Sequence, residues 1–193
     1  MNWKTTLQNI SQMINSSLDE QMIYYDKSRI RNNWLGYQGA QTNSITRKEK
    51  KLGIELPESY TKFIETSNGF KQISAFNSQL LPIEEIDWLR NTDSDFLSIF
   101  DEKDDASIDE KDYYQYNENQ QSTIFKVNHL KNTIKLSKWT DGSIILLNPK
   151  VTFNGEYEAW IYADWYPGVK RFKSFEDLIV SELHSTQELV NVI

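Results

Sequence analysis

The segment from Ser44 to Phe70 constrains the fold more than any other part of the chain, because it carries two helical patterns that meet at a tight corner. In the first pattern Ile45 and Leu52 lie seven residues apart, which places them on one face of a helix. Ser44 is the expected N-cap, since its hydroxyl can accept a hydrogen bond from a free amide at the helix start. Gly53 is predicted to stop this helix.

The second helix of this segment is predicted to begin near Pro57, whose missing amide hydrogen would have had no partner in a first helical turn. Four residues follow at the spacing of one helical face, and this face must be buried. They are Tyr60, Phe63, Ile64 and Ser67. Asn68 and Gly69 tolerate the left-handed conformation in which many helices end. Every residue of the segment has a structural explanation, so the segment organises a domain without naming a reaction.

Further helical patterns lie towards both ends of the chain. Near residue 1, apolar residues step by three or four positions, which predicts an amphipathic helix at about 3–24. Its members are Trp3, Leu7, Ile10, Ile14 and Leu18. Near the other end, Ser174 is the expected cap of a final helix, with Asp177 in the position of a capping box. The buried stripe of that helix is predicted to comprise Phe175, Leu178, Ile179 and Leu183.

The last third of the chain is predicted to form a meander of strands. The expected strands are 133–136, 143–147, 156–165 and 169–172. The first two should pair as a hairpin across Asp141-Gly142, and Asn148-Pro149 should end the second of them. Pro167-Gly168 should turn the chain before the last strand. Together the patterns predict an α+β fold, a single domain with a mostly antiparallel, twisted sheet flanked by helices.

The acidity of the chain is concentrated in one stretch. The formal net charge is −7, but residues 84–118 alone hold thirteen acidic residues against three basic ones, a net charge of −10. The overlapping span 101–119 has few aliphatic residues and carries Tyr113, Tyr114 and Tyr116. We expect it to be a long, solvated excursion from the fold.

A pattern of residues across the corner segment is shared with a known family. It comprises Ile45, Glu49, Leu52-Gly53-Ile54, Leu56-Pro57, Tyr60, Phe63-Ile64 and Asn68-Gly69. This pattern resembles the signature of the SUKH superfamily, the Smi/Knr-like proteins. The downstream order of Leu81-Pro82-Ile83, the strands at 143–147 and 156–160, and the helix opening at 172–178 is also similar.

The resemblance covers about residues 40–184, which we expect to form one α+β domain. Residues 1–39 are then an N-terminal helix and loop packed on this domain, 101–119 an acidic insertion, and 185–193 a C-terminal tail. Members of the family often act as bacterial immunity proteins, which bind and neutralise a partner toxin that is frequently a nuclease. Fungal relatives are regarded as regulators of cell-wall synthesis that work through protein contacts.

The resemblance therefore implies a binding protein and not an enzyme, since the family has no catalytic motif to transfer. It implies no cofactor. The expected partner is a cognate toxin with a basic surface, and the alternative is a regulatory or scaffold module that holds several partners.

The acidic span offers the candidate partner-binding residues. A toxin that handles nucleic acid presents Lys and Arg to phosphates, and carboxylates in phosphate-like positions could occupy that surface. Tyrosine is also enriched at binding hot spots. The candidates in this span are Asp101, Asp104, Asp105, Asp109, Glu110, Asp112, Tyr113, Tyr114 and Tyr116. The alternative is that the run is only a solvated loop.

A second candidate surface lies on the predicted strand at 156–165. Glu156, Glu158 and Trp160 alternate, so they should share one face of the strand, either as a recognition groove or as the solvent face of the sheet. Paired carboxylates also occur in glycosidases, which makes a carbohydrate-acting enzyme a third reading. The separation of about 7 Å follows from strand geometry alone, so it does not support catalysis.

Other chemistry finds little support in the residues. The chain has no cysteine, and its histidines, His129 and His184, lack a ligand partner at metal-binding spacing. Arg47, Lys48, Lys50 and Lys51 should form the solvent side of a helix, and direct nucleic-acid binding by them would oppose the net charge. The chain carries no apolar signal core and no run of membrane-spanning length, so a cytoplasmic protein is expected.

Overall fold

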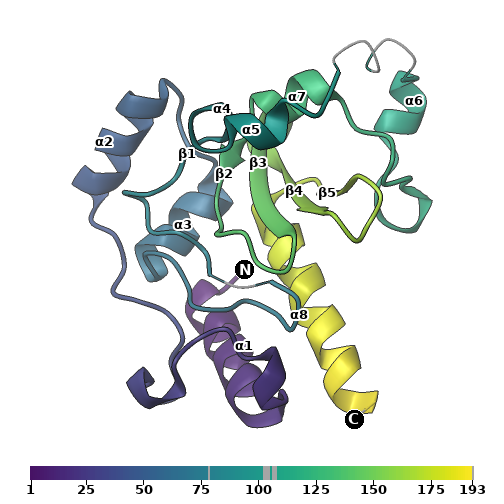
Figure 1. Cartoon of the computed structure of the whole chain (residues 1–193). Helices are drawn as coiled ribbons and strands as arrows, with labels where there is room; N and C mark the ends of the chain where they lie inside the picture. The colour runs from purple at the N-terminus through teal and green to yellow at the C-terminus, as the bar shows by residue number, and fades with distance from the viewer. Residues whose placement is uncertain (78, 102–104, 106–107, 193) are drawn as a thin grey trace. The chain divides into compact units, whose positions relative to one another are not determined.

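The computed structural model describes residues 1–77, 79–101, 105 and 108–192, and these form an α+β fold, as predicted (Figure 1). The chain groups into two compact units. Unit 1 comprises Met1–Glu85 and Ile179–Ile193, and unit 2 comprises Ile86–Leu178.

Unit 1 begins with helix α1, which spans Trp3–Ser17. The predicted apolar stripe is buried, and the Trp3 ring packs edge-on against that of Phe63 with 5.6 Å between the centroids. The prediction that the helix continues to residue 24 is wrong. Leu18 is already extended, and the chain continues in two short 3-10 helices, η1 (Glu20–Met22) and η2 (Lys27–Arg29).

The predicted helical corner is present in unit 1 as α2 (Thr42–Leu52) and α3 (Glu58–Thr66). Gly53 ends α2 in the left-handed conformation with φ +74°, and the apolar face of α3 is buried. The cap positions differ from the prediction: Gln41, not Ser44, precedes the first helical residue, and Pro57 itself occupies the N-cap of α3.

One basic residue of α2 does not face solvent as predicted. Lys48 is only 6% exposed, and its ammonium group donates a hydrogen bond of 2.9 Å to the carbonyl oxygen of Glu84. The long aliphatic part of a lysine can pack against apolar neighbours in this way while the charge finds an acceptor.

Unit 2 is built on an antiparallel sheet that has five strands, in the order β1-β2-β3-β4-β5, in the described part of the chain. The strands are β1 (Asp87–Trp88), β2 (Ile134–Lys135), β3 (Ser143–Phe153), β4 (Glu156–Ala163) and β5 (Val169–Phe172). The predicted hairpin is confirmed, since Ile134 pairs with Leu147. β3 does not end at Pro149, however, because a register shift between Asn148 and Thr152 admits the proline as an irregularity within the strand.

Unit 2 also contains several short helices, which lie within the acidic stretch or shortly after it in the chain (Figure 1). They are α4 (Leu89–Thr92), α5 (Ser94–Leu97), α6 (Glu110–Tyr113), η4 (Asn117–Asn119) and α7 (Val127–Lys131). Leu89, Leu97 and Leu130 from these helices form one hydrophobic core with Ile144, Leu146, Trp160 and Val169 of the sheet. The span 101–119, which we expected to be solvated, is also not fully exposed, since Tyr113 and Tyr116 are buried.

The last helix, α8, spans Phe175–Val192. Its start is as predicted, because the Ser174 hydroxyl accepts a hydrogen bond of 3.0 Å from the Asp177 amide. The helix continues through most of the residues predicted to form a C-terminal tail. Within the described ranges, no helix has the length and apolar character needed to cross a bilayer.

Candidate functional site

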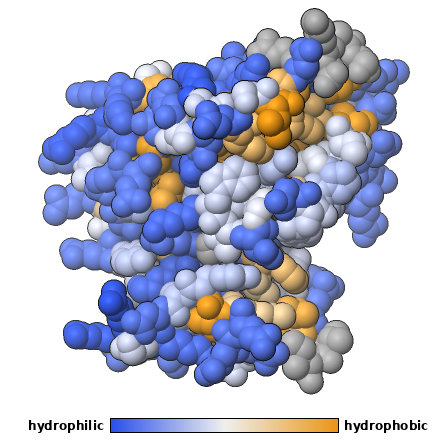
Figure 2. Space-filling view, in the orientation of Figure 1, coloured by the Kyte–Doolittle hydropathy of each residue, from blue (hydrophilic) through white to orange (hydrophobic). Residues whose placement is uncertain are grey.

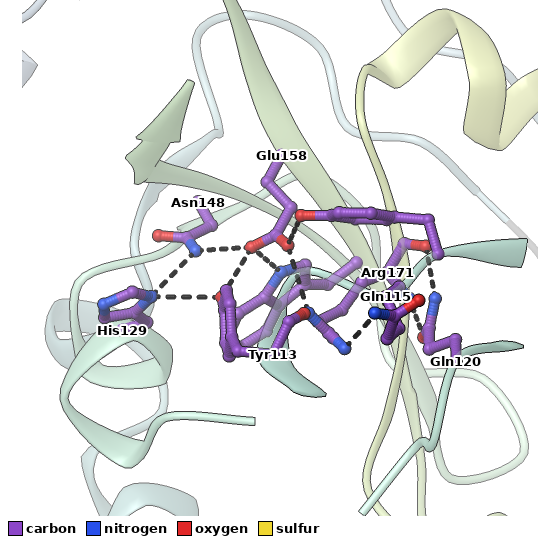
Figure 3. Close-up of polar contacts among 9 residues, drawn as sticks. Tyr113, Gln115, Gln120, His129, Asn148, Glu158 and Arg171 are labelled. Carbon is purple, nitrogen blue, oxygen red and sulfur yellow. Dashed lines mark hydrogen bonds and ion pairs between the residues drawn. The ribbon is translucent and has the colours of Figure 1, made fainter. Parts of the chain in front are cut away.

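A buried carboxylate lies at the centre of unit 2. Glu158, in the middle of β4, is 0% exposed, and polar groups surround both of its carboxylate oxygens (Figure 3). Oε2 accepts hydrogen bonds from the Tyr113 hydroxyl at 2.8 Å, the Asn148 amide at 2.8 Å and the Trp160 indole at 2.7 Å. Oε1 accepts one from the Tyr116 hydroxyl at 2.6 Å. A buried carboxylate is tolerated only when it is satisfied in this way.

The register of the sheet brings part of this cluster together. Asn148 on β3 lies directly opposite Glu158 on β4, and Trp160 follows two residues later on the same face. On β5, Arg171 lies opposite Trp160, which places it diagonally across from Glu158. Its Nη1 atom lies 3.6 Å from Glu158 Oε1, and both side chains of this ion pair are fully buried.

Arg171 ties the acidic stretch to the edge of the sheet. Its guanidinium donates hydrogen bonds to the backbone carbonyls of Tyr113 and Gln115 and lies over the ring of Tyr113. Its own backbone exchanges hydrogen bonds of 2.6 and 2.8 Å with the Gln120 amide. Among the described residues, its Nε atom has no hydrogen-bond partner. Strand β5 therefore holds the chain on both sides of η4.

Tyr113 and Tyr116 fasten the acidic stretch from its own side. Burial raises the pKa of both phenols well above the ordinary value, and the negative charge of Glu158 raises it further. Both therefore stay protonated and can donate to Glu158. The expectation that Tyr113, Tyr116, Glu158 and Trp160 form a surface for a partner is wrong in this arrangement, because all four side chains are buried. They position the acidic stretch instead.

His129 of α7 completes the cluster. Its Nδ1 atom lies 3.1 Å from the Tyr113 hydroxyl and 3.3 Å from the Asn148 amide nitrogen. Burial is the main cause that lowers the pKa of His129 below its ordinary value, and the charge of Lys126 lowers it further. Hydrogen bonding inside the fold therefore accounts for this histidine without a metal. Within the described residues, no cluster of His, Asp and Glu side chains could hold a metal ion.

The remaining candidate residues divide into structural and exposed ones. Asp105 accepts hydrogen bonds from the Val127 and Asn128 amides and so caps the start of α7. Glu156 is half-buried, and Asp104 lies outside the described residues. The exposed candidates are Asp101, Asp109, Glu110, Asp112 and Tyr114, of which Tyr114 is 49% exposed. Of the exposed carboxylates, those of Asp109, Glu110 and Asp112 lie on or beside the short helix that ends at the buried Tyr113.

Two of these exposed carboxylates also stabilise the short helix α6. Asp109 is its N-cap and accepts a hydrogen bond of 2.8 Å from the Lys111 amide, while Glu110 pairs with the ammonium group of Lys126. Asp112 and, beyond the helix, Glu118 remain exposed. No hydrogen bond or ion pair engages these two carboxylates in the described part of the chain. Such carboxylates are free to meet a cationic partner.

The geometry gives no support to the catalytic reading of Glu156 and Glu158. A glycosidase needs two carboxyl groups that reach a substrate from the two sides of a bond. Glu158 has no exposed surface, and hydrogen bonds and an ion pair occupy both of its oxygens. The same contacts exclude it from a recognition groove.

A separate hollow lies on unit 1, between α1 and the turn at 31–34. Its volume is about 880 Å³, and it is lined by Lys4, Gln8, Asn9, Gln12, Arg31, Asn32, Asn33 and Trp34. The Lys4 ammonium lies 3.8 Å from the centroid of a Trp34 ring. The described residues that line this hollow include no acid, which contrasts with the net charge of the chain.

Two comparisons with known proteins bear on this arrangement. The model of the SMI1 / KNR4 family (SUKH-1) matches residues 39–181. This range contains the helical corner, the whole sheet and the buried Glu158 cluster. A search of the curated proteins returned no match.

Proposed function

Because the chain belongs to the SMI1/KNR4 family (SUKH-1), we propose that it is an immunity protein that binds a cognate bacterial toxin and neutralises it by stoichiometric occlusion. The proposed site of action is the cytoplasm, and the proposed mode of action involves no turnover. The toxin in this proposal is a protein with a basic surface, such as a nuclease.

The observation that carries the proposal is an acidic surface on an anchored segment. The exposed carboxylates of Asp109, Glu110 and Asp112 lie on or beside α6, whose last residue, Tyr113, is hydrogen-bonded to the buried Glu158. Ordering a free loop on binding costs conformational entropy, so a segment that is already held loses less when a partner docks. Clustered charge also accelerates association with an oppositely charged partner.

A nuclease suits this surface for a chemical reason. Its active face must present Lys and Arg side chains to phosphates, and carboxylates form the same charge-assisted hydrogen bonds with those side chains. A bound inhibitor of this kind blocks the substrate without reacting with it.

A scaffold role is the second candidate, and the hollow on unit 1 favours it. Lys4 and Arg31 face this hollow together with several carboxamide side chains. Such a surface differs in charge from the acidic stretch and would suit a different partner. One tight partner with strong salt dependence supports the immunity role, whereas several weak partners support the scaffold.

The test starts from the neighbouring genes: an adjacent toxin-like open reading frame supports the immunity role, and its absence favours the scaffold role. Co-expression with the toxin from such a gene follows. The wild-type chain should rescue growth and form a one-to-one complex with an inactivated toxin in calorimetry. Good expression without rescue would contradict the immunity role. In parallel, the purified chain should leave nucleic acids and glycans intact, and turnover of either by the chain alone would contradict a purely binding function.

A further inference from the structure

Two asparagine residues of the chain are each followed by glycine, at Asn68-Gly69 and Asn154-Gly155. Hydrophilic residues cover much of the face shown in Figure 2, and the hydrophobic residues described there form separate groups. Among hydrophilic residues asparagine is chemically labile. It reacts most readily before glycine, because a following residue without a side chain leaves its amide nitrogen open to the carboxamide. The surroundings of each dipeptide therefore decide where the reaction can proceed.

The first of these dipeptides is tightly held within unit 1. The Asn68 carboxamide donates a hydrogen bond of 2.9 Å to Glu84 Oε2 and accepts one of 2.7 Å from the Ile83 amide. Gly69 is buried, and a Cβ atom placed on it would lie only 2.8 Å from the carbonyl oxygen of Leu80. The carboxamide carbon therefore cannot reach the Gly69 nitrogen unless this part of unit 1 opens locally.

The second dipeptide lies in open space in unit 2. Asn154 and Gly155 form the turn between β3 and β4, where Phe153 pairs with Glu156. Their φ angles of +52° and +83° are of the kind that a type I′ turn requires. Both residues are exposed, and apart from its chain neighbours no heavy atom lies within 4 Å of a Cβ atom placed on Gly155. Within the described ranges, no hydrogen bond engages the Asn154 carboxamide.

We propose that Asn154 is a site of spontaneous covalent modification with water as the co-reactant, and that Asn68 is protected from the same reaction. The Gly155 amide nitrogen loses its proton to solvent and attacks Cγ of Asn154. A carbon–nitrogen bond forms, the Cγ–Nδ2 bond breaks, and Nδ2 takes up a proton and leaves as ammonia. Water then opens the cyclic imide at either carbonyl, which gives aspartate or isoaspartate. No oxidation or reduction is involved.

The isoaspartate product should alter the hairpin more than the aspartate product does. Isoaspartate routes the backbone through the side-chain carbon, which adds a methylene group to a turn whose length sets the pairing of β3 and β4. At this end of β3, Phe153 packs edge-on against Tyr116 with 5.3 Å between the centroids, and the Tyr116 hydroxyl donates to the buried Glu158. The modification therefore reaches one anchor of the acidic stretch. The inference does not depend on the proposed function, and the purified chain is enough to test it.

The test is incubation of the folded chain at mildly alkaline pH, followed by peptide mapping with mass spectrometry. Each asparagine is compared with itself in the chain unfolded by guanidinium, which removes the influence of the neighbouring sequence. The ratio of the folded to the unfolded rate should be at least about tenfold higher for Asn154 than for Asn68, because Asn68 reacts only after local opening. Equal ratios would overturn the proposal, and so would a folded chain that stays unmodified at both sites.

A second measurement tests the effect on the hairpin. Labelling by isoaspartyl methyltransferase identifies the isoaspartate form, and Asn154→Asp supplies the ordinary linkage with the same change of net charge, from −7 to −8. Amide hydrogen exchange in residues 152–157 should accelerate at least about tenfold in the isoaspartate form and stay near the wild-type rate in Asn154→Asp. Equal exchange in the two forms would overturn the effect of the backbone insertion and leave the site of modification to the mapping experiment.

Discussion

At the scale of single residues, the buried pair of Glu158 and Arg171 decides how the acidic stretch is held. Two charges inside a protein lose their hydration, and this loss is offset only by close contacts with opposite charge and hydrogen-bonding groups. Glu158 finds tyrosine, amide and indole donors, and Arg171 finds backbone carbonyls of the acidic stretch. Disturbing either residue of the pair should therefore destabilise the fold, and the pair holds the acidic stretch through these particular contacts.

Replacing Glu158 by Gln should destabilise the fold strongly, because it leaves the Arg171 charge buried without a counter-charge. We expect the free energy of unfolding to fall by about 3–5 kcal/mol. The measurement is denaturant unfolding followed by tryptophan fluorescence. Glu118→Gln is the control, since Glu118 is exposed, and its midpoint should match that of the wild type. Equal midpoints for the two variants would mean that the buried pair contributes little.

His129 should make the free energy of unfolding depend on pH, and the direction of its pKa shift fixes the direction of this dependence. Its pKa in the folded state lies below the ordinary value of 6.5, chiefly because of burial, so the unfolded state takes up a proton first as the pH falls. The free energy of unfolding therefore decreases as the pH drops from about 6.5 towards the folded pKa.

Comparison with His129→Gln isolates this contribution, because titrating carboxylates are common to both chains. Urea unfolding at pH 7.5 and pH 5.5 should show a smaller loss of stability in the variant than in the wild type. The groups that face the imidazole are Tyr113, Asn148, Glu158, Lys126, Asp105 and Lys150. An equal loss in both chains would remove His129 as a source of acid sensitivity.

At the scale of elements, the segment from α6 to η4 depends on two phenol hydroxyls. Replacing Tyr113 and Tyr116 together by Phe keeps the rings but removes both hydrogen bonds to Glu158, each worth about 1.5–3 kcal/mol to a charged acceptor. Amide hydrogen exchange in residues 109–119 should accelerate at least about tenfold, while the amides shared by β3 and β4 should change less. Tyr114→Phe is the matched control, because Tyr114 is half-exposed. Uniform acceleration across the sheet would indicate global destabilisation instead.

Local patterns predicted several of the elements well. The turn at Asp141-Gly142, where both residues adopt positive φ, and the cap at Ser174 are encoded by residues within a few positions of each other. The predicted strand end at Pro149 is wrong, because the sequence does not reveal that a register shift accommodates the proline within β3.

The face of β4 was also misjudged, and for a physical reason. A glutamate that alternates with aromatic residues ordinarily indicates a solvent face, but both faces of this strand are buried: Trp160 on one and Ala159 on the other are 0% exposed. Apart from Trp160, the partners of Glu158 are residues 113, 116, 148 and 171, and no spacing along the chain connects them. The available signals were Asn148 after an apolar run and Arg171 inside a short strand.

At the scale of the whole chain, the charge of the acidic stretch has two uses. Asp93 and Asp105 accept hydrogen bonds inside unit 2. Burial alone would raise the pKa of Asp93, but hydrogen bonds from Lys135, Thr92 and Trp139 outweigh it and keep this pKa below its ordinary value. Charge counting along the sequence located the stretch but could not separate these carboxylates from the exposed ones. Tests of binding should therefore leave Asp93 and Asp105 unchanged.

The combined variant Asp95→Asn, Asp112→Asn, Glu118→Gln should associate more slowly with the inactivated toxin and show a shallower dependence on salt. All three residues are exposed, and within the described residues no hydrogen bond or ion pair engages their carboxylates. The loss of charge should therefore lower the association rate and leave the stability of the fold unchanged. Stopped-flow association at several salt concentrations measures both effects, and the unfolding midpoint should stay at the wild-type value.

The matched control carries the same change of charge on unit 1: Asp19→Asn, Glu20→Gln, Glu65→Gln. Both variants take the formal net charge from −7 to −4 because three acids become neutral, so a general effect of net charge would slow both equally. An interface on the acidic stretch should slow the first variant more than the second, because only the first removes carboxylates of that stretch. Equal association rates for the two variants would place the toxin-binding surface outside the acidic stretch.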